Sequence, residues 1–201
     1  MDYIDNNALI VDFKETDNIL HDIQGIIDSA QQYAHRAVNI ALVQRNWLIG
    51  YRIAEEELKG EKRAEYGIQL VKTLSKNLTN IYGKGYDKSN LYHFLSFYKM
   101  FPNIFDTACR QFNKLLSWSH YRVLLQVHDK EARDWYAKET AEQSWSVRTL
   151  QRNISTQYYY RLLKTQNRDS VKKEMEQLTS SYQADKQEFE NYKIMNDYCS
   201  P

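Results

Sequence analysis

The chain has 201 residues, a length that suits one compact domain with or without an appendage. Its 6 glycines and 2 prolines are few for a protein rich in turns, so the composition favours an all-α fold over a sheet protein. The net charge is only +1, yet residues 81–168 hold 14 lysines and arginines against 7 acidic residues. This basic middle predicts one face that meets a polyanion, unless the charges spread over several helices and cancel locally.

Several classes of protein are disfavoured at once. No apolar run reaches the ~20 residues of a membrane helix, and the acidic, polar start is not a secretory signal. The two cysteines, Cys109 and Cys199, form neither a CxxC motif nor a zinc-type spacing. We therefore expect a cytoplasmic protein with no membrane contact and with reduced thiols.

The N-terminal half is predicted to be dominated by one long helix. Residues 1–16 lack a period and are interpreted as an arm. Asp17 is a candidate N-cap, and apolar residues then recur at helical spacing to about residue 58, with a possible break near Gly50. Four alanines would allow a close helix approach: Ala30, Ala34, Ala37 and Ala41. Such a helix could pair subunits.

The second predicted helix, at residues 62–82, leads into the stretch IYGKGYDKSN. Its inward positions are Ile68, Val71, Leu74, Leu78 and Ile81. Gly83 is expected to end this helix in a left-handed conformation, and Gly85 to allow a sharp turn. Asp87 or Ser89 would cap a third helix, which Pro102 stops.

The result is a first helix-turn-helix-like unit. Leu91, Phe94, Leu95 and Tyr98 would face inward. The outward set proposed for phosphate and base contacts is Lys84, Lys88, Ser89, Tyr92 and His93. An ordinary αα-hairpin with a solvated polar face would show the same pattern.

Short helices are predicted over the next stretch, with caps at Ser117 or Ser119 and at Asp129. The segment TAEQSWSVRTLQR then resembles the second half of many bacterial helix-turn-helix segments, with Ser146 as N-cap. Thr140 and Ser144 stand where alanine and glycine are usual, so crowding and an altered turn are expected there.

The helix after Ser146 carries the second candidate set. Arg148, Gln151, Arg152 and Ser155 are predicted to point outward. Arginine can fork onto guanine or phosphate, and glutamine can pair with adenine. From Trp145 to Arg168 there are five basic residues and no acidic one. The alternative is a basic helix that answers acidic neighbours within the fold.

Residues 169–201 are charged and weakly periodic, which predicts a protruding C-terminal helix with a frayed end. The run Tyr158, Tyr159 and Tyr160 could stack RNA bases, which is a further alternative function. One helix cannot present three consecutive side chains on a single face, so at least one of these tyrosines should be in the core.

Long stretches of the chain resemble one family. They are NWLIGYRIAEEELKGEKRAEYGIQLVKTLSKNLTNIYGKGYDKSNLYHFLSFYKMFP and LSWSHYRVLLQVHDKEARDWYAKETAEQSWSVRTLQRNI. With their WxIG, RAEYG, W-S-H-Y and WSVRxLxRxI boxes, they are similar to the N-terminal domain of the YhcG family. His93 and Thr149 depart from the Arg and Glu expected there, and Thr149 would deprive Ser146 of its capping-box partner.

The resemblance implies a helical DNA-binding domain that normally precedes a PD-(D/E)xK nuclease domain. We expect residues 17–168 to be this domain and the nuclease domain to be absent. Double-stranded DNA is then the expected partner, with a nuclease domain in cis or in trans and a homo-oligomer formed through the long N-terminal helix. The alternative is a module that serves oligomerisation or protein interaction.

No catalytic, metal or cofactor site is predicted in the chain itself. The ExK string Glu57-Leu58-Lys59 closes a helix instead of lying on a strand beside a metal-binding aspartate. The five histidines form no metal-binding pair, and His120 is expected to be a packed core residue.

Overall fold

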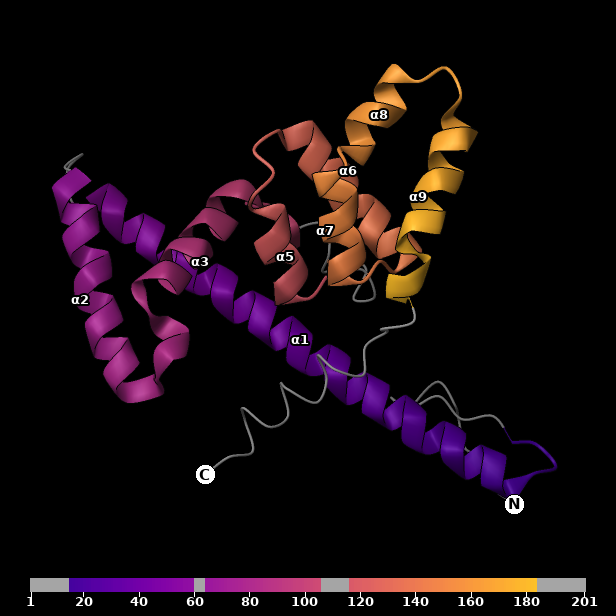
Figure 1. Ribbon diagram of the computed structural model, residues 1–201. Helices are drawn as coiled ribbons and strands as arrows, with labels where there is room; N and C mark the ends of the chain where they lie inside the picture. Colours follow the sequence, from indigo (N-terminus) through magenta and orange to yellow (C-terminus); the bar gives the residue numbers. More distant parts are fainter. Residues whose placement is uncertain (1–14, 60–63, 106–115, 184–201) are drawn as a thin grey trace. The chain divides into compact units, whose positions relative to one another are not determined.

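The computed structural model describes residues 15–59, 64–105 and 116–183 (Figure 1). Within these ranges the chain forms eight α-helices and one 3₁₀ turn and contains no strand, so the predicted all-α fold is confirmed. The elements are α1 (Ile19–Lys59), α2 (Ala64–Tyr82), η2 (Lys84–Tyr86), α3 (Lys88–Met100), α5 (Trp118–Leu124), α6 (Lys130–Gln143), α7 (Val147–Ser155), α8 (Tyr158–Lys164) and α9 (Arg168–Gln183).

The chain divides into two units, residues 1–42 and 43–201, and the boundary falls inside α1. In the first unit, α1 is capped by Asn18, whose side-chain oxygen accepts from the N–H groups of Leu20 and His21. The predicted cap at Asp17 was one residue too early. The Asp22 carboxylate accepts in return from the N–H and the hydroxyl of Thr16, which holds the chain before the helix. The predicted arm lies almost entirely outside the described residues.

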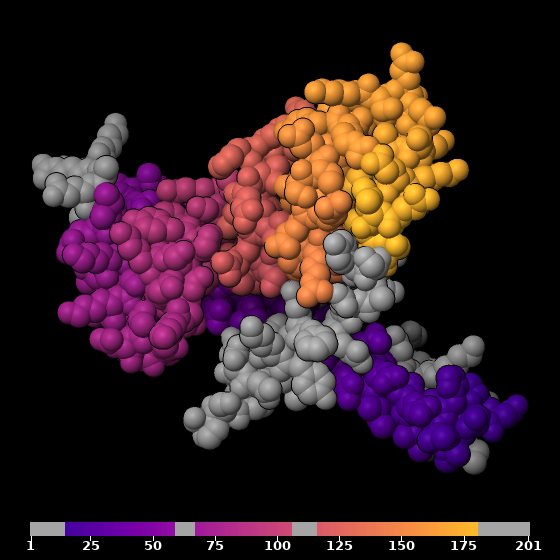
Figure 2. All heavy atoms as spheres, viewed as in Figure 1, coloured from indigo at the N-terminus to yellow at the C-terminus, as the bar shows by residue number. Residues whose placement is uncertain are grey.

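The second unit has two apolar cores. One is formed by the last part of α1 with α2 and α3, and it buries Ile53, Val71 and Leu91 among others. The larger one joins α3 to α5–α9 around Phe97, Leu124 and other fully buried side chains. In the space-filling view, the surface of this unit runs without a break from α3 (magenta) through α5 (salmon) to α7 (orange) (Figure 2).

Gly50 is a contact point and not a break in α1. A Cβ atom at this position would lie 2.0 Å from the Phe94 carbonyl oxygen on α3, so only glycine lets the two backbones approach. The Trp47 indole N–H donates to the Phe101 carbonyl at 3.0 Å, and the Lys99 ammonium contacts the Glu57 carboxylate at 3.1 Å. The predicted break was therefore wrong, because the glycine serves helix packing.

The apolar stripe predicted on α2 is buried only in its middle. Val71 is fully buried and Leu74 and Leu78 pack against the α1–α3 core, whereas Ile68 and Ile81 are 53% and 69% exposed. The ends of the stripe extend past the part of α2 that reaches this core.

The C-terminal helix does not protrude within the described residues. α9 contacts α7 and α8, and it buries Met175 and Thr179. The Thr179 hydroxyl donates to the Met175 carbonyl at 2.7 Å, which satisfies it inside the helix. The expectation of a loosely attached helix failed because one methionine and one threonine are enough to dock it on the larger core. The predicted tail beyond residue 183 lies outside the described residues.

The close approach at Gly50 gives a test of the fold. Gly50→Ala should lower the free energy of unfolding by roughly 2 kcal/mol in denaturant titrations, because the added methyl group meets backbone atoms that cannot rotate away. The matched control is Gly25→Ala in the same helix, where no atom lies within 4 Å of the added Cβ. That substitution should stabilise the helix by about 0.5–1 kcal/mol. Equal effects at the two positions would contradict the proposed contact.

Candidate nucleic-acid interface

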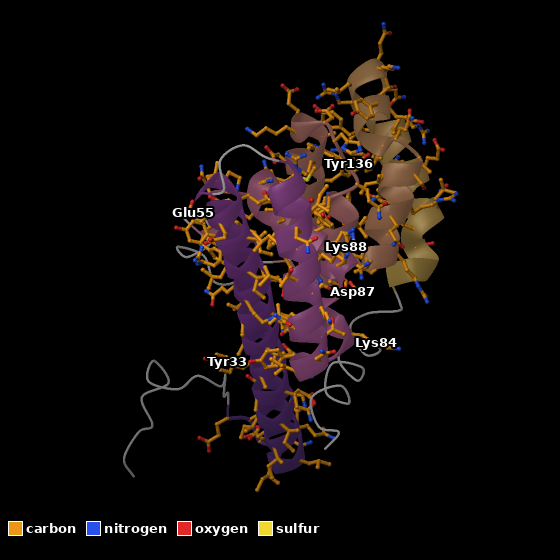
Figure 3. The ribbon with its side chains drawn as sticks, turned by 90° about the vertical axis from the view of Figure 1, so that its left-hand side faces the viewer. Tyr33, Glu55, Lys84, Asp87, Lys88 and Tyr136 are labelled. Carbon is orange, nitrogen blue, oxygen red and sulfur yellow. The ribbon has the colours of Figure 1, made fainter. Side chains whose placement is uncertain are left out.

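The turn between α2 and α3 is built differently from the expectation. Gly83 has the positive φ that was predicted, 85°, but its ψ of −174° is extended and not left-handed helical. Gly85 lies inside the 3₁₀ turn and needs no positive φ. The Asp87 carboxylate accepts from the Asn90 N–H at 2.8 Å, so Asp87, and not Ser89, caps α3. Lys84, Asp87 and Lys88 follow one another where the chain turns into α3 (Figure 3).

Most of the first candidate set is accessible at this turn. Lys84, Lys88 and Ser89 are exposed, and Tyr92 is half-buried. The Lys88 ammonium lies 5.8 Å from the centre of the Tyr92 ring, a cation–π distance that holds the two side chains together. This part of the set therefore forms one local cationic group at the start of α3.

His93 does not belong to that exposed group. Its ring is half-buried, and its Nδ1 atom is buried with no hydrogen-bond partner among the described residues. Burial lowers the pKa of His93, and the positive charge of Arg122 on α5 lowers it further, against the opposing effect of Asp87. The prediction that His93 points outward was wrong, because α5 approaches that side of α3.

The second candidate unit consists of three helices in mutual contact, α5, α6 and α7. α6 and α7 are joined by a turn of three residues, Ser144 to Ser146. Ser144 adopts the left-handed conformation (φ 51°, ψ 46°) that glycine favours, and the Trp145 N–H donates to the Thr140 carbonyl across it. The turn thus keeps the usual helix-ending geometry although Ser replaces Gly, and the strain stays at one exposed residue.

The other departures from the helix-turn-helix pattern are absorbed locally. Thr140 is buried, and its hydroxyl donates to the Tyr136 carbonyl at 2.6 Å, so its polar atom is satisfied within α6. Ser146 caps α7 as predicted and accepts from the Thr149 N–H at 3.1 Å. The buried Thr149 hydroxyl lies 2.9 Å from the Ser146 hydroxyl. Thr149 therefore remains a hydrogen-bond partner of the cap, contrary to the expectation that this partner would be lost.

His120 fixes the start of α7 to α5. Its Nε2 atom is 2.9 Å from the Trp145 carbonyl oxygen, which can only accept, so Nε2 carries a proton. Its Nδ1 atom is 2.7 Å from the Ser117 hydroxyl, which can then donate to it. The sequence analysis expected a packed residue here and missed this positioning role. The signal was a serine three residues before a histidine at the start of a helix.

The four candidate residues of α7 lie along one exposed stripe. Arg148, Gln151, Arg152 and Ser155 stand at i, i+3, i+4 and i+7 and are all exposed. The opposite side is buried through Thr149, Leu150 and Asn153. The stripe is therefore presented to solvent by a helix whose other face is held in the core. Arg122, which the sequence analysis did not single out, is exposed on α5 between α3 and α7.

The three consecutive tyrosines are engaged in the fold. Tyr158 is buried, as expected for at least one of them, and Trp135 packs against Tyr158 and Tyr159. The Tyr160 hydroxyl donates to the Asp129 carboxylate at 2.7 Å, and this bond raises the pKa of Tyr160 to about 12. Asp129 caps α6 as predicted. These rings are not an open platform for stacked bases.

Comparison with known proteins identifies the family. The chain matches the DUF1016 N-terminal domain over residues 22–161. It belongs to this family. A relative from Escherichia coli (strain K12), described as "Putative nuclease YhcG", is 34% identical over 182 residues, which cover 77% of this chain and 48% of the relative. The chain thus spans about half the length of that relative, and the predicted YhcG-type N-terminal domain is confirmed. No solved structure matches the chain.

This DUF1016 N-terminal domain was also searched for other kinds of site. Among the described residues, no three His, Cys, Asp or Glu side chains gather as metal ligands. None of the described helices is both long enough and apolar enough to cross a membrane. Glu57 of the ExK string lies in α1 and pairs with Lys99, so it serves helix packing.

The left-handed residue at the α6–α7 turn gives a second test. Ser144→Gly should raise the free energy of unfolding by about 0.5–1 kcal/mol, since glycine adopts this conformation without a steric penalty. The same exchange at the exposed helical position Ser119 should lower it by about 0.5 kcal/mol. A loss of stability for Ser144→Gly in thermal or denaturant unfolding would contradict the turn geometry.

The half-buried His93 gives a pH test. Because its pKa in the folded protein is below the reference value of 6.5, the unfolded chain takes up the proton first as the pH falls below 6.5. The free energy of unfolding should therefore drop from pH 7.5 to pH 5.5, and His93→Gln should make this drop smaller. If the parent chain and the variant lose the same stability over this interval, His93 is not held in its neutral form.

Proposed function

We propose that the second unit binds double-stranded DNA and that α7 is the helix that reads it. The single observation that carries the proposal is the stripe of Arg148, Gln151, Arg152 and Ser155. It stands exposed on the helix that follows a three-residue turn. A helix held by two others, with its N-terminal residues directed outward, is the arrangement that enters a major groove.

The chemistry of the stripe supports this function. The two arginines can each donate two parallel hydrogen bonds to guanine or to phosphate, and the glutamine amide matches the edge of adenine. No acidic residue occurs between Trp145 and Arg168, so nothing in this segment would repel a phosphate backbone.

The start of α3 would add phosphate contacts. Lys84, Lys88 and Ser89 are exposed there, and the ammonium group beside Tyr92 is suited to a phosphate oxygen as a point charge. Arg122 on α5 lies between α3 and α7 on a continuous surface (Figure 2). The proposed interface therefore follows α3, α5 and α7, with base contacts on α7 and backbone contacts elsewhere.

We infer that the DNA-binding unit targets or positions a PD-(D/E)xK nuclease domain, in cis or in trans, and does not itself catalyse. The relative from Escherichia coli carries the word nuclease in its description and is about twice as long as the matched region. A domain that holds a duplex would supply the positioning that such chemistry needs.

Assembly through the first unit is a second candidate function. Ile19, Leu20 and Ile27 are at least half exposed on α1, which is unusual for large aliphatic side chains that have no partner. This role is compatible with DNA binding, since helix-turn-helix proteins often pair to match two half-sites.

The DNA-binding proposal is tested by titrating a labelled duplex at several salt concentrations. Binding should weaken steeply with salt, and Arg148→Ala with Arg152→Ala should reduce the slope of log K against log salt by about 2. The matched control is Lys72→Ala with Lys76→Ala, which removes the same charge from exposed positions on α2. If both double variants bind as the parent chain does while circular dichroism is unchanged, α7 is not the reading helix.

A further inference from the structure

The first turns of α1 carry an apolar face that nothing in the described first unit covers. Ile19, Ile23, Ile26 and Tyr33 are 76%, 47%, 38% and 49% exposed. Unpaired apolar side chains on this scale mark a surface that another chain covers. The sequence analysis treated these residues as an inward stripe, and their exposure raises the question of what the stripe faces.

The spacing of this face is that of a coiled coil. Its residues follow one another at alternating steps of four and three: Ile19, Ile23, Ile26, Ala30, Tyr33, Ala37 and Ile40. A seven-residue repeat of this kind keeps one seam turned toward a partner helix. One flank of the seam is also apolar, with Leu20, Ile27, Ala34 and Ala41 seven residues apart.

The other flank carries the charges of the seam. Asp22 and Arg36 lie on it two heptads apart, and both stand at the g position if Ile23 is a. Hydrogen bonds from the Thr16 side chain and backbone lower the pKa of Asp22, so its carboxylate is ionised at neutral pH. In an antiparallel pair, g positions face g positions, so each Asp22 would meet the partner's Arg36.

We propose that this face pairs with the same face of a second copy of the chain, as an antiparallel helix pair centred between Ile26 and Ala30. This inference rests on the assembly role proposed above and adds the occupant, the orientation and the register.

Side-chain sizes agree with the same register. The seam layers would be Ile26 against the partner's Ala30, Ile23 against the partner's Tyr33, and Ile19 against the partner's Ala37. Two of these three layers combine a large residue with an alanine, which fills the space between closely approaching helices. On the apolar flank, Ile27 would lie beside the partner's Ile27.

A parallel pair in register fits less well. Ala30 and Ala37 would each face themselves and leave gaps, while Tyr33 would crowd against its own copy. Asp22 would face the position of Ile27 instead of an opposite charge, because g meets e in parallel pairs. Both charge and volume therefore favour the antiparallel arrangement.

Cysteine cross-linking of the full chain tests the orientation. Cys109 and Cys199 are first replaced by serine. Chains with Ile19→Cys are then mixed with chains of different mass that carry Ala37→Cys, and both are oxidised gently. An antiparallel pair gives mainly the mixed disulfide, because two copies of Ala37 would be about 27 Å apart. A parallel pair gives only the two homodimeric products. Gln32→Cys, on the opposite side of the helix, is the matched control and should not cross-link.

Sedimentation of the same proteins separates the two levels of the proposal. A dimer that gives the mixed disulfide, and that Arg36→Glu weakens about tenfold while Gln32→Glu does not, is the expected result. A dimer with only homodimeric cross-links leaves assembly standing and overturns the antiparallel register. A chain that stays monomeric at 0.1 mM, taken here as about the highest practical concentration, overturns both.

Discussion

The contact between α1 and α3 at Gly50 determines where the rest of the second unit can lie. Because Gly50 has no side chain, the backbone of α1 rests on the Phe94 carbonyl, and the Trp47 indole reaches the carbonyl of Phe101 at the end of α3. Two such points, about two turns of helix apart, leave α3 little freedom to rotate or slide. The opposite side of α3 then presents Phe94 and Phe97 to Trp118, the first residue of α5.

The same logic continues from α5 to α7. His120 donates to the Trp145 carbonyl at the end of the turn, so the point at which α7 begins is tied to α5 and not only to the flexible backbone of the turn. At the far end, the Tyr136 hydroxyl donates to the Asn153 carbonyl and accepts from the Tyr159 N–H. A recognition helix needs this kind of support, because a displacement of one ångström at its start would misplace every base contact.

Local features of the chain could be predicted from the sequence, and long-range ones could not. The caps at Asp87, Asp129 and Ser146 depend on residues at most three positions away, so their pattern is visible in a short window. Gly50 was misinterpreted because a glycine within a helix can mean a break or a close contact, and only the partner helix decides. His93 lies on the polar side of α3 by periodicity, yet α5 partly covers it. The exposed stripe of α7 was predicted because its other side is apolar at the same period.

The two surfaces differ in physical character, and this difference explains how they could act together. The stripe on α7 contains only two arginines, so one copy can release few counterions from a duplex and should bind modestly. The α1 face is mostly apolar and should associate with little dependence on salt. Pairing would link two modest DNA contacts, and the second contact would then form at a high effective concentration. Duplex binding by the dimer could thus be tight and strongly salt-dependent although the dimer itself is not.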